Sequence, residues 1–144
     1  MNDIVARAQT SIQADTEIIL DLNGKTVQGK EDNRVFSLHN QGCYLAIVDS
    51  SEEKSGKVVA GNSIMLLNQG ACVWVRYGVF ELYGGTLDIR SNSRIFYCSG
   101  TTTINGGTFT GFADDPVFCY SNAGILNVTI IAICCLKTLL QQLM

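Results

Sequence analysis

The chain has 144 residues, 47% of them hydrophobic, and a formal net charge of −3. This size and apolar content fit one domain with a continuous core. Its ten Lys and Arg are scattered and form no basic stripe, so the composition argues against a nucleic-acid-binding protein. Fourteen Gly against one Pro favour short strands joined by tight corners.

The first segment, residues 1–15, is predicted to be a capping helix. Ile4, Val5, Ala8 and Ile12 recur at a helical spacing, and Asp3 is a suitable N-cap. Such a helix would cover the open end of the structure that follows. The segment lacks the long apolar core and the cleavage site of a secretory signal, so we expect any export signal to lie outside this chain.

Residues 16–130 contain a repeat. Residues 73–94 align without a gap over residues 95–116, and this alignment superposes two copies of the motif G-G-T with a further glycine six residues before each. The identical pairs are Gly78/Gly100, Gly84/Gly106, Gly85/Gly107 and Thr86/Thr108. The upstream stretches "IILDLNGKTVQG" and "CYLAIVDSS" follow the same pattern more loosely. About four coils of 22 to 30 residues therefore account for the segment.

Each coil is predicted to contain three short strands of alternating apolar residues, bounded by Gly or Asn. Such a unit buries its apolar face only by stacking on its neighbours, which is the condition for a solenoid with parallel sheets. The side chains expected inside are Phe80, Leu82, Leu87 and Ile89, and those expected outside are Glu81, Asp88 and Arg90. Asn40, Asn68 and Asn122 are expected to form a ladder at one corner. The predicted fold is all-β.

The stretch "LDLNGKTVQG", followed by repeated "GGT[LF]", resembles the right-handed parallel β-helix proteins of the pectin-lyase-like superfamily, especially long cell-surface proteins of gut bacteria. The resemblance implies a right-handed parallel β-helix. These families include adhesins, polysaccharide lyases, glycoside hydrolases and phage tailspikes. We expect a non-catalytic module of a bacterial surface or extracellular protein, for adhesion or glycan binding. The alternatives are a polysaccharide lyase or glycoside hydrolase, and a phage fibre segment, which would form trimers.

Aromatic and charged residues gather in residues 73–94, the first of the two aligned copies. The candidate binding residues are Trp74, Arg76, Tyr77, Glu81, Tyr83 and Asp88. Aromatic faces beside charged groups are typical of a groove for a polysaccharide or a cell-surface glycan. The competing interpretation is that Trp74, aligned with Phe96, belongs to the core.

No catalytic residue is predicted. Asp21 and Glu81 are expected in one outward column, with Arg76 and Arg90 as the available bases for a lyase, but outward charges on a solenoid are usually its solvated face. His39 has no Ser or Cys partner at a recognisable spacing, so a structural role is expected for it.

The six cysteines form no C-x-x-C pair, and "GGTLD" departs from the calcium-binding nonapeptide, so neither a metal nor a cofactor is expected. The gaps between Cys43, Cys72, Cys98 and Cys119 lie near the repeat length. This spacing favours buried thiols stacked in neighbouring coils over a disulfide framework.

The end of the chain, residues 131–144, departs from the repeat. Residues 125–136 are almost all apolar, but Lys137 ends this run well short of the roughly 20 residues of a membrane span. Three interpretations remain: a cap over the last coil, a membrane-associated tail, and the frame-shifted end of a longer repeat gene. An uncovered end would permit end-to-end self-association.

Overall fold

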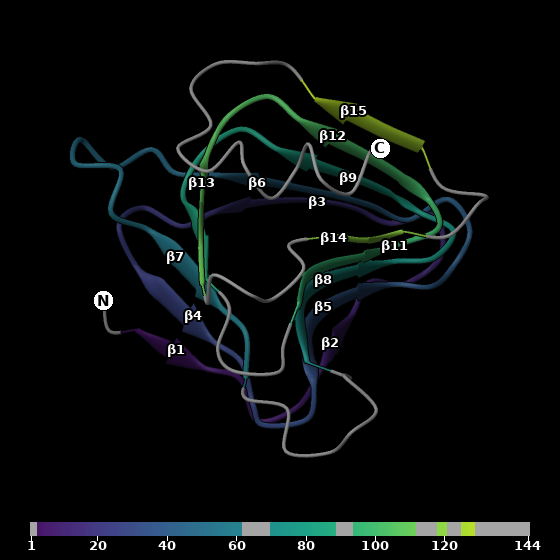
Figure 1. Ribbon diagram of the computed structural model, residues 1–144, viewed down its shortest axis with the longest axis horizontal. Helices are drawn as coiled ribbons and strands as arrows, with labels where there is room; N and C mark the ends of the chain where they lie inside the picture. The colour runs from purple at the N-terminus through teal and green to yellow at the C-terminus, as the bar shows by residue number, and fades with distance from the viewer. Residues whose placement is uncertain (1–2, 62–69, 89–93, 112–117, 121–124, 129–144) are drawn as a thin grey trace.

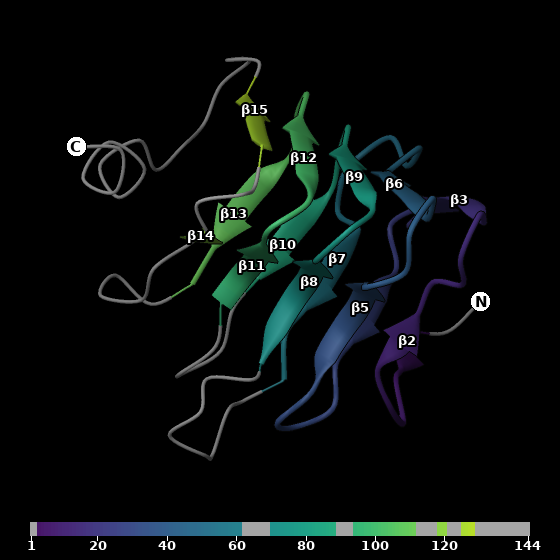
Figure 2. The same cartoon turned by 90° about the vertical axis from the view of Figure 1, so that its right-hand side faces the viewer.

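The computed structural model describes residues 3–61, 70–88, 94–111, 118–120 and 125–128. Within these ranges the chain is all β, with three parallel sheets of five strands each, here named A, B and C. Figure 1 shows the three sheets around a common interior, and Figure 2 shows the strands of each sheet stacked along one axis. This arrangement is compatible with a parallel β-helix.

The strands are two to five residues long, as expected for a chain with frequent Gly corners. Sheet A contains β1 (Ile4–Val5), β4 (Thr26–Gln28), β7 (Lys57–Val59), β10 (Thr86–Asp88) and β13 (Thr108–Thr110). Sheet B contains β2 (Thr10–Ser11), β5 (Arg34–Leu38), β8 (Ala71–Val75), β11 (Arg94–Cys98) and β14 (Phe118–Tyr120). Sheet C contains β3 (Glu17–Asp21), β6 (Tyr44–Val48), β9 (Val79–Leu82), β12 (Thr101–Ile104) and β15 (Ile125–Val128).

The chain visits sheets A, B and C in turn, so three consecutive strands form one rung and the five-stranded sheets stack five rungs. The sequence predicted about four coils because residues 1–15 were assigned to a helix, and that assignment is wrong. This segment forms β1 and β2, which pair with β4 and β5 of the next rung. Ile12 is buried, whereas Ile4 and Val5 are 56% and 70% exposed, so the four apolar residues do not share one buried face.

Asp3, the predicted N-cap, has a different role. Its Oδ1 accepts a hydrogen bond from the backbone N–H of Thr26 at 2.9 Å, which ties the first rung to the second. A parallel strand gains its hydrogen bonds from a neighbour distant in sequence, and local spacing carries no information about that neighbour.

The 22-residue repeat holds in two of the three sheets. In sheets A and C, Thr86 pairs with Thr108 and Leu82 with Ile104. In sheet B, however, Trp74 pairs with Tyr97, which is 23 residues away (97 − 74), and Phe96 pairs with Val73. The corner after β11 is correspondingly shorter than the corner after β8, which restores the register in sheet C.

The core is built from rows of apolar side chains that run along the stack. Phe80, Leu82 and Leu87 are fully buried, as the alternation of apolar residues predicted. Each stacks on buried partners of the preceding rung: Leu45, Ile47 and Val58. Glu81 and Asp88 lie on the outer faces, also as predicted, whereas Ile89 and Arg90 lie outside the described residues.

The corner at 49–56, between β6 and β7, is organised by a buried carboxylate. Asp49 is 5% exposed, and its Oδ1 accepts hydrogen bonds from the backbone N–H of Gly24 at 2.9 Å and from the Ser51 hydroxyl at 2.8 Å. Its Oδ2 accepts one from the backbone N–H of Gly56 at 2.7 Å. One side chain thereby closes its own corner and joins it to the corner of the preceding rung.

Of the predicted asparagine ladder, only Asn40 lies within the described residues; Asn68 and Asn122 lie outside them. Asn40 donates from Nδ2 to the carbonyl oxygen of Ile12 at 2.8 Å, and so bridges two rungs. The apolar tail predicted over 131–144 also lies outside the described residues. None of the described segments is a helix long and apolar enough to cross a membrane.

Cys43 and Cys72 are buried free thiols, as predicted. The predicted stacking of cysteines is not observed in sheet B, where Cys98 pairs with Val75 of the preceding rung.

Burial raises the pKa of both the Cys43 and the Cys72 thiol, and only the thiolate is nucleophilic. We therefore expect iodoacetamide to label these two cysteines at neutral pH only after unfolding in guanidinium, as measured by peptide mass spectrometry. Rapid labelling of Cys72 in the native protein would contradict the buried placement.

Candidate functional site

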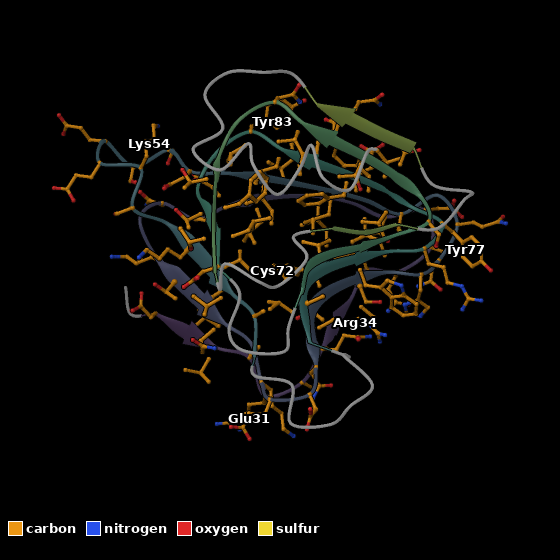
Figure 3. The ribbon with its side chains drawn as sticks, viewed as in Figure 1. Glu31, Arg34, Lys54, Cys72, Tyr77 and Tyr83 are labelled. Atoms are coloured by element: carbon orange, nitrogen blue, oxygen red, sulfur yellow. The ribbon has the colours of Figure 1, made fainter. Side chains whose placement is uncertain are left out.

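The six residues predicted as a binding groove lie in three separate places. Trp74 is on β8, and Arg76 and Tyr77 are in the corner between β8 and β9. Glu81 and Tyr83 lie on the outer face of sheet C. Asp88 ends β10 in sheet A. Figure 3 labels Tyr77 and Tyr83 at opposite ends of sheet C. A single groove lined by all six residues is therefore not formed.

The outer face of sheet C carries a cluster of two tyrosines around one carboxylate: Tyr44, Glu81 and Tyr83. The hydroxyls of Tyr44 and Tyr83 each donate a hydrogen bond of 2.7 Å to Oε2 of Glu81. Tyr83 follows Glu81 by two residues and so points to the same face, while Tyr44 reaches Glu81 from the adjacent strand β6. We call these three residues the tyrosine–glutamate cluster.

Ala46 allows the cluster to form. It stands opposite Glu81 in the register of β6 and β9, yet it is only 2% exposed although it points outward. A methyl group at this position leaves room for the Tyr44 and Tyr83 rings to converge above it. The cluster was missed in part by sequence reasoning, because Tyr44 belongs to the preceding rung, 37 residues before Glu81.

The hydrogen bonds fix the charge of the cluster. Donation from Tyr83, and then from Tyr44, lowers the pKa of Glu81. Burial, with a smaller contribution from the Glu81 carboxylate, raises the pKa of Tyr44 to about 12, and the hydrogen bond to Glu81 raises the pKa of Tyr83. At neutral pH the cluster is therefore one carboxylate held by two neutral phenols. The other carboxylate oxygen of Glu81, Oε1, accepts no hydrogen bond from the described part of the chain.

Asp21 does not share the outward column of Glu81, so that prediction is wrong. The row of Glu81 contains Ala46 and Ile19, whereas Asp21 pairs with Val48, two residues further along. The Oδ1 atom of Asp21 instead accepts hydrogen bonds from the backbone N–H groups of Asn23 and Ser50, at 3.0 and 2.9 Å. Asp21 therefore stabilises a corner and is not a second carboxylate beside Glu81.

Trp74 is half-buried on the outer side of sheet B and makes contacts there. The Arg34 guanidinium carbon lies 4.0 Å from the Trp74 ring centroid, and the His39 ring stacks on Trp74 with a centroid distance of 6.0 Å. His39 is oriented by a hydrogen bond between Nδ1 and the Ser37 hydroxyl at 3.0 Å. Trp74 thus lies outside the central core, and its ring is in contact with Arg34 and His39.

The remaining predicted residues stand apart from these groups. Tyr77 is 55% exposed, with the Arg76 guanidinium carbon 5.0 Å from its ring centroid. Asp88 accepts a hydrogen bond from the Thr110 hydroxyl at 2.8 Å on sheet A. Among the described residues, no group of three or more His, Cys, Asp or Glu side chains is arranged to hold a metal ion.

Comparisons with protein-family models, curated proteins and solved structures find no match for this chain. The sheets and the side-chain clusters described above are therefore the basis of the functional inference.

Proposed function

We propose that this protein is a non-catalytic carbohydrate-binding module of a bacterial surface or extracellular protein, built as a right-handed parallel β-helix of the pectin-lyase-like type. Three parallel sheets visited in turn support the fold. Crossovers between parallel strands are right-handed in almost all proteins, which supports the handedness. The repeated "GGT[LF]" motif supports the superfamily.

The observation that carries the proposal is the tyrosine–glutamate cluster. The Tyr83 ring is 50% exposed and offers an apolar face on which the C–H groups of a sugar ring can pack. Beside it, Oε1 of Glu81 can accept hydrogen bonds from sugar hydroxyls, and bonds to an ionised acceptor are the stronger kind. Because the Tyr83 hydroxyl is already bonded to Glu81, the ring is held in place before the ligand arrives, which reduces the entropy lost on binding.

The charge state of Glu81 does not suit the role of a catalytic acid. A glycosidase needs a carboxylic acid whose pKa is raised, so that it can protonate the leaving oxygen. The two tyrosine hydroxyls lower the pKa of Glu81 instead. Glu81 is thus suited to accept hydrogen bonds from the hydroxyl groups of a ligand.

We expect Tyr83→Ala to weaken glycan binding by about tenfold, since stacking on one exposed aromatic ring contributes on the order of 1 kcal/mol and the Glu81 carboxylate also loses an orienting partner. Tyr83→Phe keeps the ring and should lose less. A glycan array identifies the ligand, and isothermal titration calorimetry then compares the variants. The control is Val5→Ala, which removes an apolar side chain that is 70% exposed on sheet A.

Equal affinity of the wild type and Tyr83→Ala, or no glycan bound at all, would refute the proposal. Release of an unsaturated uronate from an acidic polysaccharide, abolished by Glu81→Gln, would identify the protein as a lyase instead.

A further inference from the structure

Charged residues are sorted by sheet in this protein. The described strands of sheet B contain no Asp or Glu but contain Arg34 and Arg94, which occupy the same register row on either side of Ala71. The strands of sheet C contain Glu17, Asp21 and Glu81 but no Lys or Arg. The strands of two adjoining sheets, in a chain with a net charge of −3, thus contain charged residues of opposite sign.

A further arginine, Arg76, lies beside His39 in the corner that leads from sheet B to sheet C. Ser37 pairs with Trp74, so His39 and Arg76, which each follow their strand by the same number of steps, occupy equivalent positions in adjacent rungs. The backbone N–H of Arg76 donates to the carbonyl oxygen of Leu38 at 2.9 Å, which holds the two segments together. We call the resulting strip of Arg34, His39, Trp74, Arg76 and Tyr77 the basic corner.

The basic corner is accessible and partly preorganised. Arg76 and Tyr77 are exposed, and Figure 3 places Arg34 and Tyr77 on the same side of the molecule, outside sheet B. The Trp74 and Tyr77 rings hold the Arg34 and Arg76 guanidinium groups at 4.0 and 5.0 Å by cation–π contact. The exposed Arg76 guanidinium, held over the Tyr77 ring, still directs its N–H donors sideways, and these match the oxygens of a planar or tetrahedral oxyanion.

We propose that the basic corner binds the oxyanion substituents, carboxylate or sulfate, of an acidic glycan. This inference rests on the proposed function and names its ligand class. Arg76 precedes Val79, the first residue of β9, by three residues, and from Val79 to Tyr83 the chain spans roughly 13 Å at the usual rise per residue of a strand. A glycan of a few residues can therefore place its acidic group at Arg76 and an uncharged ring at Tyr83, where Glu81 repels a second acidic group.

The test measures binding of the full chain to three glycans by affinity electrophoresis and calorimetry: heparin, which is sulfated, polygalacturonate, which is carboxylated, and neutral dextran. We expect Arg76→Gln to weaken binding of the preferred acidic glycan by about fivefold at low salt, with a smaller effect at high salt, because exposed ion pairs are screened. The matched control is Lys57→Gln, which removes an exposed cation from sheet A and should bind as the wild type does.

Binding of heparin alone would identify sulfate as the recognised group, and binding of polygalacturonate would identify carboxylate; either result supports the inference if Arg76→Gln weakens it. Equal losses in Arg76→Gln and Lys57→Gln would overturn it, as would equally tight binding of DNA. Tight binding of a neutral glycan only would overturn this inference while leaving the proposed function intact. Failure to bind any glycan would overturn both.

Discussion

Gly85→Ala is expected to lower the free energy of unfolding by about 2–4 kcal/mol, because it adds strain of two kinds. Gly85 has φ +85°, which L-residues rarely adopt. An added Cβ would also lie 2.6 Å from Cδ1 of Leu22 and 3.2 Å from the carbonyl oxygen of Gly56, which belong to the two preceding corners on this side of the stack. Urea denaturation followed by circular dichroism measures the loss.

The neighbouring glycine provides the control. A Cβ added to Gly84 would meet the backbone nitrogen of Asp49 at 3.3 Å, and its φ is not positive. We expect Gly84→Ala to cost less than about 1 kcal/mol. If both variants lost the same free energy of unfolding, the second glycine of the G-G-T motif would not be required for stacking.

Asp49→Asn is expected to lower the free energy of unfolding by about 2–4 kcal/mol at neutral pH. The amide nitrogen of Asn cannot accept hydrogen bonds, so one buried backbone N–H, of Gly24 or of Gly56, loses its partner, and the other bond loses its charge. Chemical denaturation measures the difference. Asp88→Asn, which alters one surface hydrogen bond to Thr110, is the control and should lose far less.

The loss of stability in Asp49→Asn is also expected to depend on pH. Burial alone would raise the pKa of Asp49, but the hydrogen bonds from Gly24, Ser51 and Gly56 outweigh it, so the folded-state pKa lies below the ordinary value. A carboxyl group with a lowered folded pKa stabilises the protein above its unfolded pKa, about 3.9, and this contribution is lost as the pH falls through the folded pKa. The stability difference between wild type and Asp49→Asn should therefore shrink below about pH 4. A difference independent of pH would contradict this assignment.

The sequence predicted the core well because its signal is local. Alternation with a period of two places Phe80 and Leu82 on one side of a strand and Glu81 on the other, whatever the strand pairs with. The stacking of Leu82 on Ile104 was likewise predictable from the glycine repeat. Residues 1–15 were predicted wrongly because their apolar spacing suits a helix equally well, and their strand partners lie a full rung away.

The candidate site was predictable only in part. Residues between Trp74 and Asp88 are close in sequence, but the chain turns two corners within this stretch and distributes them over three faces. The partners that complete each group, Tyr44 for Glu81 and Arg34 for Trp74, come from the preceding rung. Between these two rungs the paired residues are 35 apart in sheet C (79 − 44) and 37 apart in sheet B (74 − 37), so the 22-residue repeat does not predict the partners.

The Asp49 corner has a consequence for how such a chain can vary. Its two ends are joined by the 2.7 Å bond between Oδ2 of Asp49 and the N–H of Gly56, so the strands on either side do not depend on what lies between. Figure 3 places Lys54 in this corner on the outside of the three sheets, where its Nζ donates a hydrogen bond to the carbonyl oxygen of Asp49 at 2.9 Å. Residues inserted between Glu52 and Glu53 would be displayed outward without shifting any ladder. Evolution could lengthen this tip freely, and a designer could use it to graft a foreign peptide epitope.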